Sequence, residues 1–124
     1  MALSIPPEQM QKYKRTAQAR WQTQRAQQRL RQQLAWQLAR QAANLLKDEY
    51  DAERVVVFGS LTQADRFSAR SDVDLAAWGL TAANWLRASA AVRDLSSQTE
   101  LNLVDVACCL PELVAVIERD GVPL

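Results

Sequence analysis

The pattern of hydrophobic and polar positions along this 124-residue chain changes period several times, and each period predicts an element. From residue 8 to about residue 47 there is no Gly or Pro, and Gln, Ala, Arg and Leu dominate, which predicts one long helix or two in series. A stripe at helical spacing is expected to face a core over the second half: Leu30, Leu34, Leu38, Ala42 and Leu45. The first half is poorer in apolar residues, so we expect it to project or to lie across a partner.

The rest of the chain alternates between short apolar runs and helical stretches. Strands are predicted at 54–58, 72–78 and 100–107, and helices at 82–95 and 111–119, the last opened by a proline. This order predicts an α/β (α+β) fold with one small mixed sheet, flanking helices and a long N-terminal helix. We expect residues 1–47 to form a basic helical extension and residues 48–124 to form the domain.

The net charge of +1 hides an asymmetry between the two parts of the chain. Residues 1–40 hold eight Lys or Arg and one acid, whereas residues 41–124 hold seven basic and thirteen acidic residues. The basic positions are spread around the predicted helix, which favours a solvated helix or a docking arm for an acidic partner over a nucleic-acid site. The helix could also pair with a second copy of the chain. No apolar run approaches the roughly 20 residues of a membrane span.

Cysteine and histidine usage narrows the chemistry further. The only cysteines are the neighbours Cys108 and Cys109, which cannot form an ordinary disulfide, and no signal peptide is expected at residues 1–11. We therefore expect a cytoplasmic protein. The chain has no histidine, which excludes histidine triads and histidine zinc sites. Proton transfer would fall to carboxylates, water or a partner.

One segment combines the elements of a phosphate site and a metal site. The apolar strand at 55–58 ends in Gly59 and Ser60, and the next strand carries Asp72 and Asp74. Strand side chains alternate with a period of two, so both carboxylates point the same way and repel unless a cation lies between them. Mg²⁺ suits such a pair. A glycine lets the backbone approach an anion closely, and a serine can donate to phosphate oxygens, which together indicate nucleotide chemistry.

Four segments carry a resemblance to a known family: Val-Val-Phe-Gly-Ser-Leu (56–61), Ser-Asp-Val-Asp-Leu-Ala (71–76), Leu-Asn-Leu-Val-Asp-Val (101–106) and Ile-Glu-Arg-Asp-Gly-Val (117–122). Over about residues 40–124 the chain resembles the minimal nucleotidyltransferase domain of the DNA polymerase β-like superfamily, the antitoxin half of HEPN/MNT toxin–antitoxin pairs. The resemblance implies that Gly59 and Ser60 hold ATP and that Asp72 and Asp74 bind Mg²⁺. Ser71, beside the acids, is a further candidate for nucleotide binding.

The activity that the resemblance implies is transfer of AMP from ATP to a tyrosine of a partner HEPN ribonuclease, which would make the chain a Mg²⁺-dependent protein adenylyltransferase. Two alternatives remain. A degenerate domain could neutralise its partner by binding alone, or the chain could be a nucleotidyltransferase acting on a small molecule.

The chain departs from the family pattern at the third carboxylate, which the family places on the following strand. Asn102 occupies that position, and an amide is neutral and cannot accept a proton. Asp105 is the candidate third catalytic acid, although three residues further on it falls on the opposite face of a regular strand. Glu100 shares the face of Asn102 and is the other candidate. The sequence leaves open whether either acid replaces the missing carboxylate.

Overall fold

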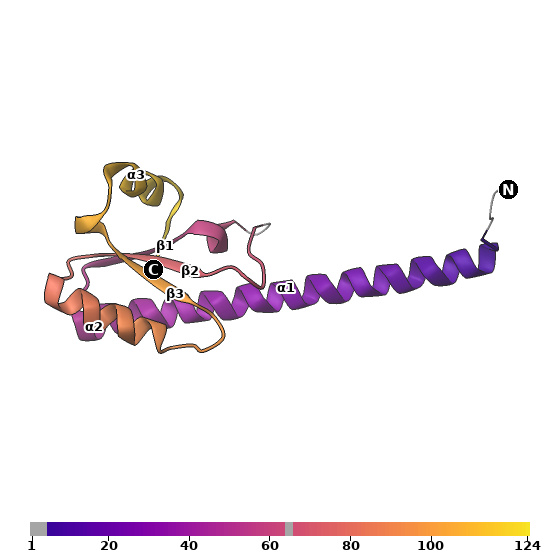
Figure 1. Cartoon of the computed structure of the whole chain (residues 1–124), viewed down its shortest axis with the longest axis horizontal. Helices are drawn as coiled ribbons and strands as arrows, with labels where there is room; N and C mark the ends of the chain where they lie inside the picture. Colours follow the sequence, from indigo (N-terminus) through magenta and orange to yellow (C-terminus); the bar gives the residue numbers. More distant parts are fainter. Residues whose placement is uncertain (1–4, 64–65) are drawn as a thin grey trace.

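A computed structural model describes residues 5–63 and 66–124 of the chain. Three helices and four strands follow one another along the sequence (Figure 1). They are α1 (Pro7–Tyr50), β1 (Arg54–Phe58), β2 (Val73–Trp78), α2 (Ala82–Arg93), β3 (Leu101–Asp105), α3 (Pro111–Asp120) and β4 (Val122–Pro123). Two short 3₁₀ helices interrupt this order, η1 (Gly59–Thr62) directly after β1 and η2 (Val106–Cys108) directly after β3. The three predicted strands and the three predicted helices are all present, with ends that shift by up to three residues.

The four strands form a single mixed sheet in the order β3-β2-β1-β4. β1 is antiparallel to both β2 and β4, whereas β2 and β3 are parallel and joined through α2. The predicted fold class is therefore confirmed. The two-residue strand β4 was not predicted; it lies at the edge of the sheet, where a proline without an N–H costs no ladder hydrogen bond.

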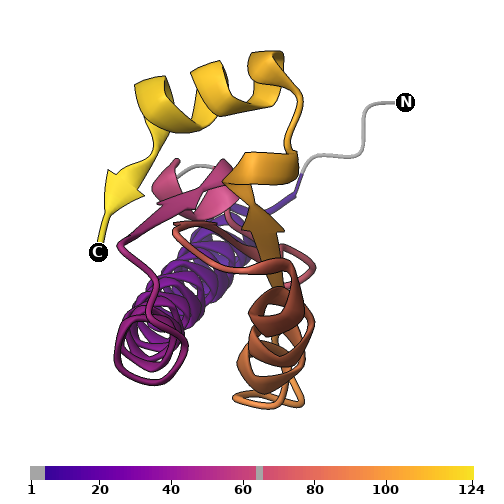
Figure 2. The ribbon, with the colours of Figure 1, turned by 90° about the vertical axis from the view of Figure 1, so that its left-hand side faces the viewer.

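The helices cover the two faces of the sheet unequally. α1 and α2 lie against one face and α3 against the other (Figure 2). The main core lies under α1 and α2 and includes Leu46, Leu75 and Leu101, all fully buried. A small cluster of Val56, Ala76 and Ile117 lies on the α3 face. Because side chains of a strand alternate between these faces, the face to which a polar residue belongs decides which residues it can meet.

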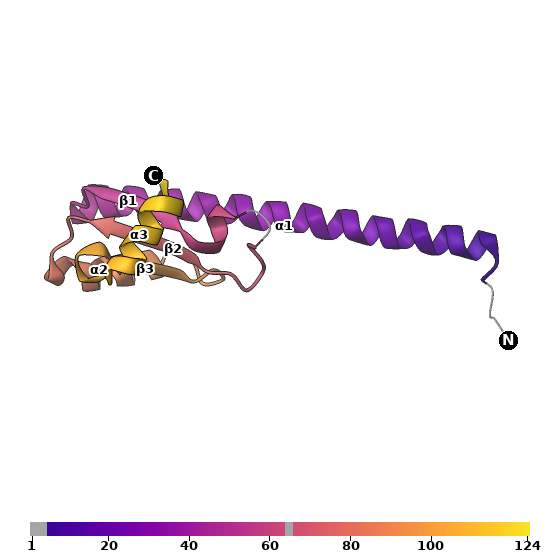
Figure 3. The same cartoon turned by 90° about the horizontal axis from the view of Figure 1, so that it is seen from above.

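Helix α1 is one continuous helix, and only part of the predicted stripe faces the core: Ala42 is buried, and Leu38 and Leu45 pack against the core. The buried residues are Ala35, Ala39, Ala42, Ala43 and Leu46, while Leu30 and Leu34 are 55% and 50% exposed. The expectation that Leu30 and Leu34 face the core was therefore wrong, because the contact with the sheet is made mainly by small side chains, which let the helix approach closely. The N-terminal part of α1 extends beyond the sheet (Figure 3). No described helix combines the length and apolar character needed to cross a membrane.

Candidate nucleotide and metal site

The turn after β1 brings the backbone against an acidic side chain. Gly59 has a φ of +81°, and a Cβ placed on it would lie 2.7 Å from Oδ2 of Asp74. Only glycine accepts both this conformation and this approach. The hydroxyl of Thr62 donates to the Gly59 carbonyl at 2.8 Å and closes the turn. The Gly-Ser turn and the Asp74 carboxylate are thus direct neighbours, as the strand pairing of Phe58 with Asp74 requires.

Asp72 and Asp74 lie side by side at the start of β2, on the face that α3 covers. A single amide group spans both carboxylates, because Nδ2 of Asn102 lies 3.2 Å from Oδ1 of Asp74 and 3.4 Å from Oδ2 of Asp72. Asn102 reaches them because β3 runs parallel to β2 with Asn102 opposite Asp74. The structure therefore brings together Gly59, Asp72, Asp74 and Asn102.

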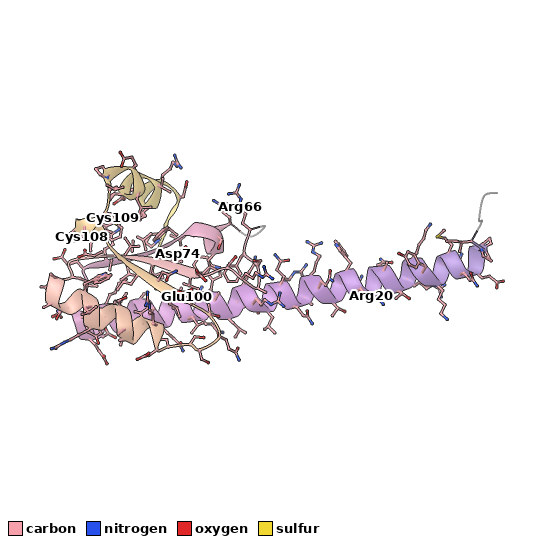
Figure 4. The ribbon with its side chains drawn as sticks, in the orientation of Figure 1. Arg20, Arg66, Asp74, Glu100, Cys108 and Cys109 are labelled. Atoms are coloured by element: carbon pink, nitrogen blue, oxygen red, sulfur yellow. The ribbon has the colours of Figure 1, made fainter. Side chains whose placement is uncertain are left out.

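The electrostatics of this cluster disfavour an ionised Asp74. Burial raises the pKa of Asp74 most, the hydrogen bond from Asn102 lowers it, and the charges of Asp72 and Glu100 raise it, with a net increase. Glu100 is exposed and comes directly before β3, where its backbone carbonyl accepts a hydrogen bond from Val73 (Figure 4). A cation between Asp72 and Asp74 would oppose the effects of burial and like charge that raise the pKa of Asp74.

The donor set fits Mg²⁺. This ion takes one or two protein carboxylates and completes its octahedron with water and substrate phosphates. Asp72 and Asp74 supply two such carboxylates beside the Gly59 turn. Within residues 5–63 and 66–124, no three Asp, Glu or Cys side chains gather as a larger ligand set. The remaining ligands would come from water and phosphate, or from the amide oxygen of Asn102 after rotation of its side chain.

The two candidate serines occupy different parts of the site. Ser60 is half-buried in η1, directly after Gly59, and its backbone carbonyl accepts from Gln63. The Ser71 hydroxyl organises the loop before Asp72, since its oxygen accepts from the Ser68 N–H at 2.9 Å and donates to the Arg66 carbonyl at 3.4 Å. Both residues lie next to the cluster in sequence, and nucleotide binding by either remains a prediction.

Asp105 lies apart from the other predicted catalytic residues. It pairs with Ala77, three positions beyond Asn102 along β3, and shares its face with Leu103 of the main core. Its carboxylate accepts the Ala107 N–H at 3.1 Å and lies 3.7 Å from Sγ of Cys108, so it caps η2. The two-residue period of the strand explains this separation. A catalytic role for Asp105 stays a prediction that this arrangement does not favour.

Sequence reasoning did not anticipate that Asn102 bridges both aspartates. The available signal was its position, two residues after Glu100 on the strand where a third carboxylate was expected. The contact itself depends on the register between β2 and β3.

Comparisons with known proteins place the fold. No protein-family model matches the sequence, and no curated protein matches it. Among solved structures, a chain of a toxin–antitoxin crystal structure with AMP-PNP is 19% identical, with a TM-score of 0.57, over 68% of this chain and 70% of that chain. A mutant of the toxin–antitoxin MntA-HpeT is 17% identical, with a TM-score of 0.56 and the same coverage.

A predicted nucleotidyltransferase of Sulfolobus solfataricus is also similar, with 17% identity and a TM-score of 0.50 over 74% of this chain and 80% of that chain. Identities this low establish shared architecture and leave the activity to be argued from the site. These structural similarities, together with the mixed sheet and its flanking helices, lead to one conclusion: this chain has the fold of these nucleotidyltransferase-like structures.

Proposed function

We propose that this protein is a cytoplasmic nucleotidyltransferase antitoxin that transfers AMP from ATP to a tyrosine of a partner HEPN ribonuclease and thereby silences it. The observation that carries the proposal is the close approach of the Asp74 carboxylate to Gly59, with Asp72 beside it. The solved structures of similar fold add support, since two belong to toxin–antitoxin complexes and one of these contains AMP-PNP, an ATP analogue.

Each residue of the cluster has a defined task in this proposal. Asp72 and Asp74 would hold Mg²⁺, which orients the phosphates and offsets the charge that develops during transfer. Gly59 admits the triphosphate to the backbone, and the Ser60 hydroxyl can donate to a phosphate oxygen. The phenol oxygen of the acceptor attacks the α-phosphorus while the bond to pyrophosphate breaks. The phenol proton passes to water or to a carboxylate, because the Asn102 amide cannot take it.

Asn102 also favours a second candidate, in which the domain neutralises its partner by binding without transfer. Its amide donates to both aspartates at the position where the third acid was expected. Such hydrogen bonds partly stabilise the two carboxylates without a bound cation. A protein of this kind would keep the fold and the partner but turn over slowly or not at all.

A labelling experiment separates the two candidates. The protein is incubated with α-labelled ATP, Mg²⁺ and the HEPN protein encoded beside it, and the label on the HEPN protein is quantified. We expect labelling that Asp72→Ala/Asp74→Ala and EDTA both abolish. Asp94→Asn is the matched control, because Asp94 is exposed at the end of α2, and it should label normally. Neutralisation that persists in the unlabelled double variant would establish binding alone. Label that persists in the double variant would contradict the site.

A further inference from the structure

The N-terminal half of α1 leaves the body of the protein as an arm. Gln28 marks the root of the arm, because its side-chain amide donates to the Phe67 carbonyl at 3.0 Å. Residues 7–27, which we call the arm, continue the helix away from the sheet in two perpendicular views (Figures 1 and 3). At about 1.5 Å per residue the arm is about 30 Å long. This length is comparable to the width of a small domain, so the arm can span a partner.

The arm carries the same face that α1 buries against the sheet. Positions 28 and 21 precede the buried Ala35 by seven and fourteen residues, and positions 17 and 10 precede it by eighteen and twenty-five, which is about five and seven whole helical turns. A step of seven residues returns to nearly the same side of a helix. Met10, Ala17 and Trp21 therefore extend the buried face, with Tyr13 beside them, and we call these four residues the arm stripe. Tyr13 is 72% exposed and Trp21 is 54% exposed, so the stripe is uncovered in the single chain.

Positive charges border the arm stripe on both sides. Lys12 and Arg20 line one shallow surface depression together with Tyr13 and Trp21. Arg25 borders the other side, where its guanidinium lies 4.7 Å from the centroid of the Trp21 ring, and Lys14 lies seven residues before Trp21 on nearly the same side of the helix. A surface that covers the stripe must meet these cations, which favours a partner rich in Asp and Glu. Two arms paired with each other would bring like charges together, and this disfavours pairing of the arms of two copies.

The root of the arm contacts the loop that leads into the candidate site. Gln28 holds the carbonyl of Phe67, a buried residue five positions before Asp72, so the arm is anchored to the loop that leads into the aspartates. Asp74 and Glu100 lie on the body of the protein, beyond the point where the arm begins (Figure 4). A protein bound along the arm would be held beside the site, and this raises the effective concentration of its acceptor group.

We propose that the arm stripe docks into an apolar groove with an acidic rim on the partner protein and so presents the acceptor side chain to the Gly59–Asp74 cluster. The identity of that partner as the HEPN protein rests on the proposed function, whereas the chemistry of the docking surface rests on the arm alone. Tryptophan is a frequent interface hot spot, so Trp21→Ala is expected to weaken the complex about 30-fold or more.

The test uses the whole chain and the HEPN partner that the proposed function expects to be encoded by a neighbouring gene, and it measures the Kd without nucleotide, so that chemistry plays no part. Leu30→Ala is the matched control for Trp21→Ala. Leu30 is 55% exposed, like Trp21, and lies nine residues away on the opposite side of the helix. Leu30→Ala should leave the Kd unchanged. Lys14→Glu/Arg25→Glu should weaken binding and reduce its dependence on salt, and circular dichroism should show an intact helix in every variant.

An unchanged Kd in Trp21→Ala overturns the docking proposal. So does a Trp21→Ala defect limited to binding of a duplex RNA or DNA, or to self-association of the chain. Label transfer in the same variants separates this proposal from the proposed function. If binding requires Trp21 but even the wild type transfers no label, the docking proposal stands and the proposed AMP transfer is wrong. If label transfer and binding do not change in Trp21→Ala, the proposed AMP transfer stands and the docking proposal is wrong. If the wild type does not bind the HEPN protein, both proposals are wrong.

Discussion

The two ends of strand β2 carry similar components in different arrangements. At the start of β2, Gly59 with φ of +81° lies against Asp74, and Asn102 of β3 bridges Asp74 and Asp72. At the far end, Gly79 with φ of +87° follows the strand, and Asp105 of β3 lies opposite Ala77. Each end thus combines a glycine in the left-handed region with an acid.

The difference between the ends lies in what the acid meets. The Asp74 carboxylate meets a second carboxylate, the Asn102 amide and the Gly59 turn, whereas the Asp105 carboxylate meets a backbone N–H and caps η2. A carboxylate satisfied by its own backbone is a structural group. A carboxylate whose ionised form is disfavoured by burial and like charge is typical of functional sites. The role of an acid in this fold therefore depends on the groups around it more than on its residue type.

The largest expected difference between the two ends of β2 appears when each acid, Asp74 or Asp105, is replaced by Asn. Asp74→Asn should lower AMP transfer about a thousandfold, because it removes a charge that would stabilise the transferring phosphate through the cation. Asp105→Asn should leave the rate within about twofold, since Asn caps helices as well as Asp does. Initial rates with labelled ATP measure both. A large rate loss in Asp105→Asn, with the fold intact, would place Asp105 in the site and break the comparison.

The second effect concerns the missing acid. Asn102→Asp places a third carboxylate beside Asp72 and Asp74, and a positioned base contributes about 10²- to 10⁴-fold in enzymes. We expect AMP transfer to rise at least tenfold at saturating Mg²⁺. In EDTA the same variant should unfold at lower denaturant concentration than the wild type, because three carboxylates repel one another. A rate that stays constant or falls would mean that the site already has its proton acceptor, with Glu100 as the first residue to mutate next.

Much of this arrangement could be predicted from the sequence. β1 was predicted at its observed bounds because an apolar run lies between Arg54 and Gly59, and the two-residue period placed Asp72 beside Asp74. The face that α1 buries could be predicted only in part, since Ala42 is buried as expected but Leu30 and Leu34 are exposed. Leucine is the more hydrophobic residue, but close contact with the sheet selects alanine at positions 35, 39, 42 and 43. The hydrogen bonds from Asn102 to both aspartates could not be predicted either, because they depend on the register of parallel strands that are far apart in sequence.

The two glycines offer a matched test of stability against binding. Gly59→Ala and Gly79→Ala both force alanine into the left-handed region, and at each position a Cβ would lie 2.7 Å from a side-chain atom, of Asp74 and of Glu53 respectively. Each substitution is expected to cost about 1–3 kcal/mol of the free energy of unfolding. Only Gly59→Ala should also weaken nucleotide binding, measured by calorimetry with Mg²⁺ and a non-hydrolysable ATP analogue. Equal binding losses in both variants would indicate a general loss of folded protein and would remove Gly59 from the site.

The smallest expected effect is a pH dependence of stability in the metal-free protein. Burial and the charges of Asp72 and Glu100 raise the pKa of Asp74 above its usual value of 3.8, against the hydrogen bond from Asn102. The folded state therefore holds the Asp74 proton more tightly than the unfolded state does. Stability from this group is complete below the usual pKa and is lost as pH rises through the raised pKa.

Denaturant unfolding in EDTA between about pH 4 and 7 measures this loss of stability. The range begins at the usual pKa of aspartate, because the pKa of Asp74 is raised above it. Asp74→Asn should remove the fall in stability, since the amide does not titrate. Mg²⁺ should oppose the fall in the wild type, because the ion binds the ionised pair and contributes about 2.7 kcal/mol at a hundredfold excess over its Kd. Identical pH profiles for wild type and Asp74→Asn would show that the charge of Asp74 is already fully compensated, and the two ends of β2 would then not differ electrostatically.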